Sequence, residues 1–139
     1  MKRYILVLFL FSFIFFSCKT GIDNPLVGNW EIVEFRFTDW ERDPGRDEDF
    51  LKKDGAIWDM EFSKNGKFKQ SFNMRRPDKK METEEGTWRT VGDTLKIETQ
   101  SDGTTSKWDY TYELNDSTLT MTLAGEMIDS KLIIKFREK

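Results

Sequence analysis

After residue 27, apolar and polar side chains alternate along the chain in short segments. A period of two is typical of a β-strand that buries one of its faces. The pattern is clearest from Trp108 to Leu114, where Asp109, Thr111 and Glu113 stand between four apolar side chains. Eight such segments are separated by turn residues, and they cover residues 30–37, 58–62, 68–74, 81–91, 95–98, 108–114, 118–123 and 131–137.

Two of these segments contain an irregularity. In the first, Trp30 and Ile32 share one parity, whereas Phe35 and Phe37 share the other. One extra residue in a strand produces this switch, so we expect a β-bulge between the two pairs. In the fourth, Gly86 indicates a bulge or a bend, because glycine inside a strand often marks such a position.

Most links between the segments are short, which favours an antiparallel up-and-down sheet with one apolar face. The helical candidate, Asp47–Lys53, has about two turns and is too short to cover that face. A sheet that closes on itself hides the face and removes its own edges. We therefore predict an all-β domain over residues 27–139, an eight-stranded antiparallel up-and-down barrel without a C-terminal helix. A β-sandwich is the alternative, but hairpin links leave no Greek-key crossover.

The first residues of the chain have a different character. Lys2 and Arg3 precede Tyr4–Phe16, thirteen residues without a charge, and Ser17 is followed by the single cysteine, Cys18. A basic start, a short apolar run and a small residue are typical of a secretory signal peptide.

A cysteine in this position resembles the lipidation site of bacterial lipoproteins, although Phe15-Phe16 departs from the usual leucine and small residue there. The resemblance implies that residues 1–17 are removed, that Cys18 carries acyl chains such as palmitate, and that residues 18–26 tether the domain to a membrane. Such chains anchor a protein because each buried methylene contributes about 0.8 kcal/mol. Lys19 stands where lipoproteins retained at the inner membrane carry aspartate, so the resemblance favours the bacterial outer membrane and leaves the leaflet open.

Charge and composition exclude several functions. The 139 residues include no histidine and carry a formal net charge of −3. Beyond the first seventeen residues, which hold two bases and no acid, 20 basic and 25 acidic side chains remain. A mildly acidic surface offers no footprint for nucleic acid, and the absence of histidine removes the commonest general base and zinc ligand. We expect a monomeric, non-enzymatic protein that uses neither a metal nor a cofactor.

Three motifs resemble the lipocalin superfamily. They are Gly28-Asn29-Trp30, the hairpin Phe62–Phe68 with Asn65-Gly66 at its turn, and Gly86-Thr87-Trp88. In this order, and with a long polar loop after the first strand, they are most similar to the small lipocalin-like domains of lipid-anchored bacterial proteins. The resemblance implies a barrel that binds a small apolar ligand. The Thr-Asp-Tyr motif of larger lipocalins is missing, and Arg137 corresponds only by position to the arginine that stacks over their tryptophan.

Aromatic side chains on the inner face, with one polar neighbour, are the candidates for a ligand site. They are Trp30, Trp58, Gln70, Phe72, Trp88, Trp108, Tyr110 and Tyr112. The competing interpretation is a filled interior, because twenty-two mostly large side chains share this face and protein cores pack to crystal-like density. A filled barrel would act through its loops, with Trp40 and Phe50 as aromatic anchors for an envelope protein. A cavity of about 300 Å³ or more would favour the ligand carrier.

Three charged clusters are interpreted as solvated surface. They are the acidic loop Asp39–Asp49, the carboxylates Glu82, Glu84 and Glu85, and the bases Arg75, Arg76, Lys79 and Lys80. The acidic loop lacks the glycine and the glutamate that a calcium-binding EF-hand requires at its sixth and twelfth positions. The carboxylates are assigned to the solvent face of the fourth strand, and the bases to the tip after the third.

Overall fold

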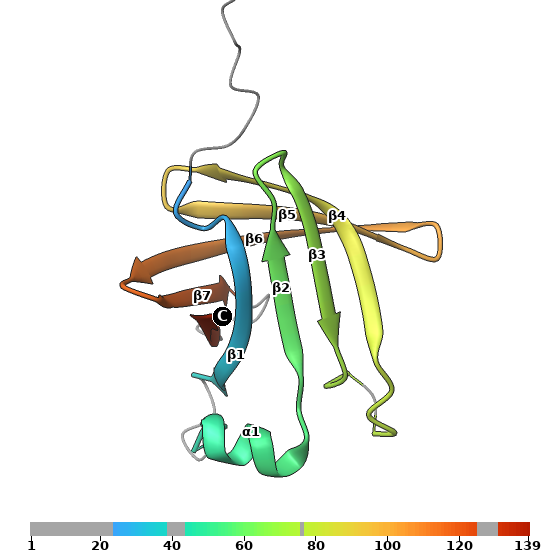
Figure 1. Ribbon diagram of the computed structural model, residues 1–139, viewed down its shortest axis with the longest axis vertical. Coiled ribbons are helices and arrows are strands. Elements are labelled where there is room, and N and C mark those ends of the chain that lie inside the picture. The colour runs from blue at the N-terminus through green and yellow to red at the C-terminus, as the bar shows by residue number, and fades with distance from the viewer. Residues whose placement is uncertain (1–23, 39–43, 76, 125–130) are drawn as a thin grey trace, which may run out of the picture.

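The computed structural model describes residues 24–38, 44–75, 77–124 and 131–139. Their strands form a closed barrel in sequence order, with every neighbouring pair antiparallel and the last strand paired to the first (Figure 1). The strands are β1 (Gly28–Phe37), β2 (Trp58–Phe62), β3 (Lys67–Phe72), β4 (Glu82–Val91), β5 (Thr94–Ser101), β6 (Thr104–Asn115), β7 (Thr118–Ala124) and β8 (Lys131–Glu138). The predicted up-and-down barrel is confirmed, and the sandwich alternative is wrong.

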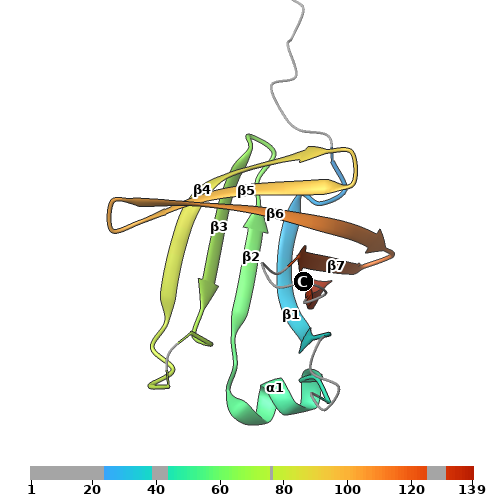
Figure 2. The same ribbon diagram turned by 180° about the vertical axis from the view of Figure 1, so that it is seen from behind.

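The barrel is strongly bent at β4, and both views show β5 and β6 crossing β2 and β3 steeply (Figures 1 and 2). The N-terminal half of β4 pairs with β3, and its C-terminal half pairs with β5. Gly86 lies where the two pairings overlap, and both registers run through it without a shift. A Cβ atom at Gly86 would lie 1.8 Å from the carbonyl oxygen of Glu98. Glycine is therefore required here because the two backbones approach closely at a bend, and not because of a bulge.

The bulge predicted in the first strand is present. The pairing of β1 with β8 shifts register between Ile32 and Glu34. The extra residue turns Phe35 toward the interior, whereas the side chain of Glu34 reaches Lys135 on the outside, with 2.7 Å between its Oε2 and the lysine Nζ. The bulge thus adds apolar side chains to the inner face at the end of β1.

A short helix, α1 (Glu48–Asp54), lies at one end of the barrel (Figure 1). Its first turn is capped by Asp47, whose side chain accepts a hydrogen bond from the amide of Phe50 at 2.9 Å. Gly55 ends the helix in the left-handed conformation at φ 66°. Leu51 is buried and anchors the helix to the core.

Arg137 lies on the outer face of the barrel, opposite to the side chain of Trp30, because the register pairs it with Glu31. It therefore does not take the position expected from larger lipocalins. Its guanidinium donates hydrogen bonds to Glu31 at 2.7 Å and to Glu48 at 3.0 and 3.1 Å, which ties α1 to β1. Arg137 and Lys52 together lower the pKa of Glu48 to about 2.

The end of the barrel opposite α1 is tightly packed. Trp30 donates its indole N–H to the carbonyl oxygen of Leu26 at 2.9 Å, and Trp88 donates to that of Ser63 at 3.0 Å. The ring of Phe62 meets the ring of Trp88 edge to face, with centroids 5.2 Å apart. Leu26 is 0% exposed, so the packed domain already includes this residue of the expected tether.

Candidate functional site

The half of the barrel beside α1 is hollow. A cavity of about 450 Å³ that opens to solvent lies there, bounded by inward side chains of six strands, by Arg46 before α1, by α1 and by the segment between β3 and β4. Its lining is mainly apolar and aromatic, with four charged side chains and one amide. The lining residues are Phe35, Phe37, Arg46, Leu51, Asp54, Trp58, Gln70, Phe72, Met74, Arg75, Lys79, Trp108, Tyr110, Leu123 and Leu132.

The structure divides the eight ligand-site candidates between the two halves of the barrel. Trp58, Gln70, Phe72, Trp108 and Tyr110 line the cavity. Trp30 and Trp88 do not, because they fill the packed end, and Tyr112 packs half-buried against the core without reaching the cavity wall. Side-chain parity predicts that all eight face inward, but it contains no information about depth along the barrel.

A chain of hydrogen bonds crosses one wall of the cavity. Trp58 donates its indole N–H to Gln70 Oε1 at 3.0 Å, and Gln70 Nε2 donates to Glu84 Oε2 at 2.7 Å. Arg75 then donates to Glu84 Oε1 at 3.2 Å and to Glu82 at 3.5 Å. Gln70, the polar residue on the inner face, therefore has two partners, as a buried amide requires.

The assignment of Glu84 to the solvent face is wrong. Glu84 is 7% exposed and points inward, because it has the same parity along β4 as Trp88. Burial of a carboxylate is costly unless it is paired, and here Gln70 and Arg75 supply that pairing. Glu85, with the opposite parity, is exposed.

Two bases after β3 keep the predicted contact with solvent, with side chains 56% exposed at Arg75 and 38% at Lys79, but they also make specific contacts. The guanidinium of Arg75 lies 4.8 Å from the ring centroid of Phe72, and Lys79 is ion-paired with Asp54 at the end of α1. Both side chains therefore belong to the wall of the cavity, where they link the segment after β3 to β4 and to α1. Lys80 is exposed as expected, and Arg76 lies outside the described residues.

Tyr110 lines the cavity and carries the wall's phenolic hydroxyl group. Burial, with a smaller contribution from the charge of Glu84, raises its pKa to about 12. Tyr110 is 7% exposed, and its hydroxyl makes no hydrogen bond to the described part of the chain. It therefore remains a protonated, unused hydrogen-bond donor at neutral pH.

The raised pKa of Tyr110 predicts a loss of stability in alkali. An unfolded tyrosine loses its proton near pH 10, whereas folded Tyr110 keeps its proton to about pH 12, so the unfolded state binds fewer protons between these values. The free energy of unfolding is expected to fall there by up to about 1.4 kcal/mol per pH unit on account of this residue. Urea denaturation at pH 9, 10 and 11 measures this fall, and Tyr110→Phe should show a shallower one. Equal slopes for the two proteins would contradict the prediction.

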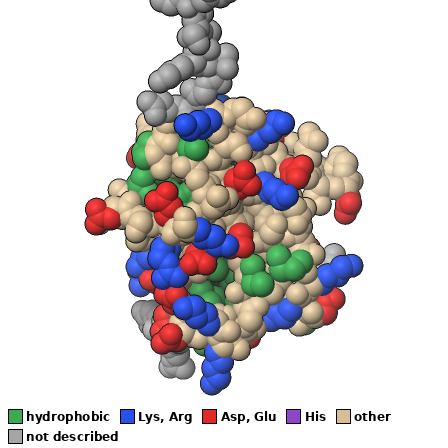
Figure 3. All heavy atoms as spheres, in the orientation of Figure 1, with side chains coloured by type: hydrophobic (Ala, Val, Ile, Leu, Met, Phe, Trp, Pro, Cys, Tyr) green, Lys and Arg blue, Asp and Glu red, His purple; other side chains and the backbone are tan. Residues whose placement is uncertain are grey.

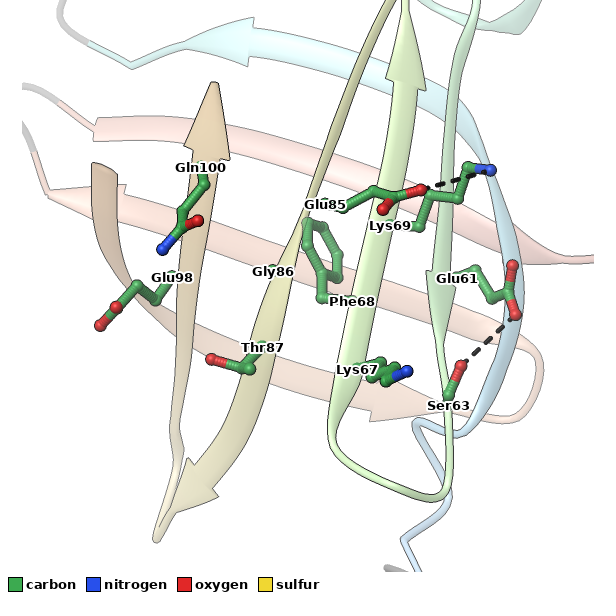
Figure 4. A pocket seen from close by; sticks show the side chains of 10 residues that line it. All are labelled: Glu61, Ser63, Lys67, Phe68, Lys69, Glu85, Gly86, Thr87, Glu98 and Gln100. Atoms are coloured by element: carbon green, nitrogen blue, oxygen red, sulfur yellow. Dashed lines mark hydrogen bonds and ion pairs between the residues drawn. The ribbon is translucent and has the colours of Figure 1, made fainter. Parts of the chain in front are cut away.

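A second hollow, of about 750 Å³, lies on the outer surface over β2 to β5. Figure 4 shows its wall, which is polar apart from Phe68 and Gly86 and includes Lys69 and Glu85, whose charged groups are 3.8 Å apart. In the orientation of Figure 1, the molecular surface also carries positive and negative side chains next to one another (Figure 3). Water can hydrogen-bond the polar and charged side chains of such a surface, so the outer hollow needs no ligand. We therefore place the candidate site in the barrel cavity.

Other candidate chemistry finds no support in the described ranges. No group of His, Cys, Asp or Glu side chains there is arranged to hold a metal ion. None of the described residues belongs to a helix long and apolar enough to cross a membrane. The signal segment 1–17, Cys18, Trp40 and residues 39–43 of the acidic loop lie outside the described residues. Phe50 is exposed on α1, and the guanidinium of Arg46 lies 6.0 Å from the centroid of its ring.

A closed eight-stranded barrel with one packed end and one hollow end defines a class of small cavity-forming β-barrels. Residues 26–130 match the family model described as a lipocalin-like domain. The chain therefore belongs to the lipocalin-like domain family, as its motifs indicate.

Solved structures align with this chain at low sequence identity. An uncharacterized protein from Bacteroides eggerthii aligns with a TM-score of 0.51 and 16% identity, over 82% of this chain and 99% of the other. A lipocalin-like protein from Bacteroides uniformis gives a TM-score of 0.47 and 18% identity, over 82% and 98% of the chains. The fluorescent protein UnaG gives a TM-score of 0.46 and 18% identity, over 81% and 96%. No curated protein matches the chain closely enough to count as a relative.

Proposed function

We propose that the protein is a non-enzymatic, lipid-anchored component of the bacterial envelope that binds one small, largely apolar molecule inside its barrel. The observation that carries this proposal is the cavity of about 450 Å³ lined by Trp58, Phe72, Trp108 and Tyr110. Ligand pockets commonly have volumes of about 300–1,000 Å³ and mainly apolar walls with a few polar groups. The cavity also argues against the filled-barrel alternative, because an interior packed throughout would leave no such space.

The anchor in this proposal is the lipid on Cys18, and the sequence before residue 24 supports it. Figure 1 shows the chain entering the barrel at the end away from α1, where the side chain of Asn24, the first described residue, donates to Thr90 Oγ1 at 3.1 Å. Cys18 precedes Asn24 by six residues, which span about 20 Å at most. A lipid on Cys18 would therefore hold the packed end nearest the outer membrane, and the hollow end would point away from it.

Filling the cavity is the direct test of ligand binding. The neutral fluorescent probe N-phenyl-1-naphthylamine is expected to bind the purified chain, with a rise in its emission. Leu132→Trp places a larger side chain in the cavity wall and should weaken binding by about tenfold or more, since one methylene already changes affinity severalfold. Thr111→Trp, on the exposed outer face of β6, is the matched control and should bind as the wild type does.

The outcome is informative in both directions if each variant is shown to melt cooperatively. Probe binding that is absent in the folded wild type would refute the proposed function. Equal affinity for Leu132→Trp and wild type would place the binding outside the barrel cavity and would refute it as well.

A further inference from the structure

The cavity contains a polar region on an otherwise apolar wall. The buried hydroxyl of Tyr110 has no hydrogen-bond partner among the described residues, and Tyr110, Gln70 and Trp58 all line the same space. No protein group among the described residues therefore uses the hydrogen bond that this hydroxyl can donate. A ligand group that accepts a hydrogen bond could bind to Tyr110 without displacing a protein contact.

Glu84 lies directly behind the polar part of the wall, because it accepts a hydrogen bond from Gln70 at 2.7 Å, although it does not itself line the cavity. Its charge acts on Tyr110 and contributes to the raised pKa of that hydroxyl. Glu84 also receives hydrogen bonds from Gln70 and Arg75, one on each carboxylate oxygen, and each oxygen still has a lone pair. A ligand group next to these residues must therefore tolerate a negative charge, and it gains most if it can donate a proton as well as accept one.

The cations around the cavity already have partners on the protein. Arg75 contacts Glu84 and Glu82, and Lys79 contacts Asp54. The guanidinium of Arg46 lies 5.7 Å from the ring centroid of Phe35. A ligand carboxylate would have to displace one of these contacts, and it would also be repelled by the charge of Glu84 behind Gln70.

We propose that the natural ligand has an apolar body and a neutral group that both donates and accepts hydrogen bonds, such as a hydroxyl, and that Tyr110 and Gln70 bind this group inside the cavity, with Glu84 behind Gln70. The proposal rests on the proposed ligand-binding function and adds the chemical class of the ligand. Tyr110 donates to the ligand oxygen, and the ligand O–H donates to Gln70 Oε1, which accepts one hydrogen bond from Trp58 and has a second lone pair. Glu84 is then a specificity residue that rejects anionic ligands of the same shape.

Three probes of one shape test the proposal at pH 7: naphthalene, 2-naphthol and 2-naphthoate, each competing with N-phenyl-1-naphthylamine on the purified chain. 2-Naphthol is expected to bind about tenfold more tightly than naphthalene, the effect of one or two good hydrogen bonds in a buried site. 2-Naphthoate is expected to bind at least about tenfold more weakly than 2-naphthol, because its charge is buried beside Glu84.

Two substitutions assign the effects to residues. Tyr110→Phe should bring 2-naphthol to within about threefold of naphthalene, since only the hydroxyl is removed. Glu84→Gln should reduce the preference for 2-naphthol over 2-naphthoate, because the repulsive charge is gone. Tyr112→Phe removes a hydroxyl that does not line the cavity, and this control should behave as the wild type. If Glu84→Gln fails to fold, the comparison of Tyr110→Phe with Tyr112→Phe still decides the question.

The possible results separate the inference from the proposed function. Equal binding of the three probes, or tightest binding of 2-naphthoate, would overturn the inference and leave a ligand-binding barrel. If the competed probe itself does not bind the folded chain, both the proposed function and the inference are wrong.

Discussion

Gly86→Ala is expected to destabilise the barrel by about 3 kcal/mol or more, the upper range for overpacking in a well-packed protein. The added methyl carbon would lie 1.8 Å from the carbonyl oxygen of Glu98 and 2.8 Å from the Cα of Thr99. Both are backbone atoms of β5, which is paired with β4 on one side and β6 on the other. Neither can move without breaking hydrogen bonds, so the clash cannot be relieved by a change of rotamer. Urea denaturation measures the effect as a lower midpoint at unchanged slope.

Gly103→Ala is the matched control for this substitution. Gly103 has φ 78°, and an added Cβ would meet no atom within 4 Å, so the cost is only that of a left-handed backbone. That cost is about 1–2 kcal/mol. A loss at Gly86 no larger than the loss at Gly103 would mean that the two strands are farther apart than described here.

The period of two allowed the fold to be predicted from the sequence, because strand alternation is a local property. All twenty-two side chains expected inside are buried or packed against the core. The parity switch near Ile32 predicted the bulge, and Asp47 and Gly55 bracket the helix as capping residues do. In each case the signal lies within a few residues, so no long-range contact was needed.

The cavity could not be located in this way, since depth along the barrel depends on how distant strands are staggered. Trp30 and Trp58 look alike in sequence, yet one fills the packed end and the other lines the cavity. Parity after the bulge was a usable signal for Phe35 and Phe37, which also line the cavity. Parity likewise indicated that the side chain of Glu84 points inward. Its charge, however, led to its assignment to the solvent face. The partner that makes its burial tolerable, Arg75, is on a different segment of the chain.

Removal of Arg75 should expose the energetic role of the buried carboxylate. Arg75→Met keeps an apolar stem over Phe72 but leaves Glu84, at 8% side-chain exposure, without its cation. Breaking a fully buried ion pair costs about 3–5 kcal/mol. Because the side chain of Arg75 is 56% exposed, we expect a smaller loss of about 2 kcal/mol in the free energy of unfolding.

A double-mutant cycle separates this pairing from the other effects of each substitution. The variant Arg75→Met with Glu84→Gln should recover much of the loss, because no uncompensated charge remains inside the barrel. The outer pair Lys69–Glu85 is the control, since its side chains are 52% and 73% exposed and its coupling should not exceed about 0.5 kcal/mol. A coupling between Arg75 and Glu84 as small as that of the outer pair would mean that water reaches Glu84, and the basis for rejecting anionic ligands would then be lost.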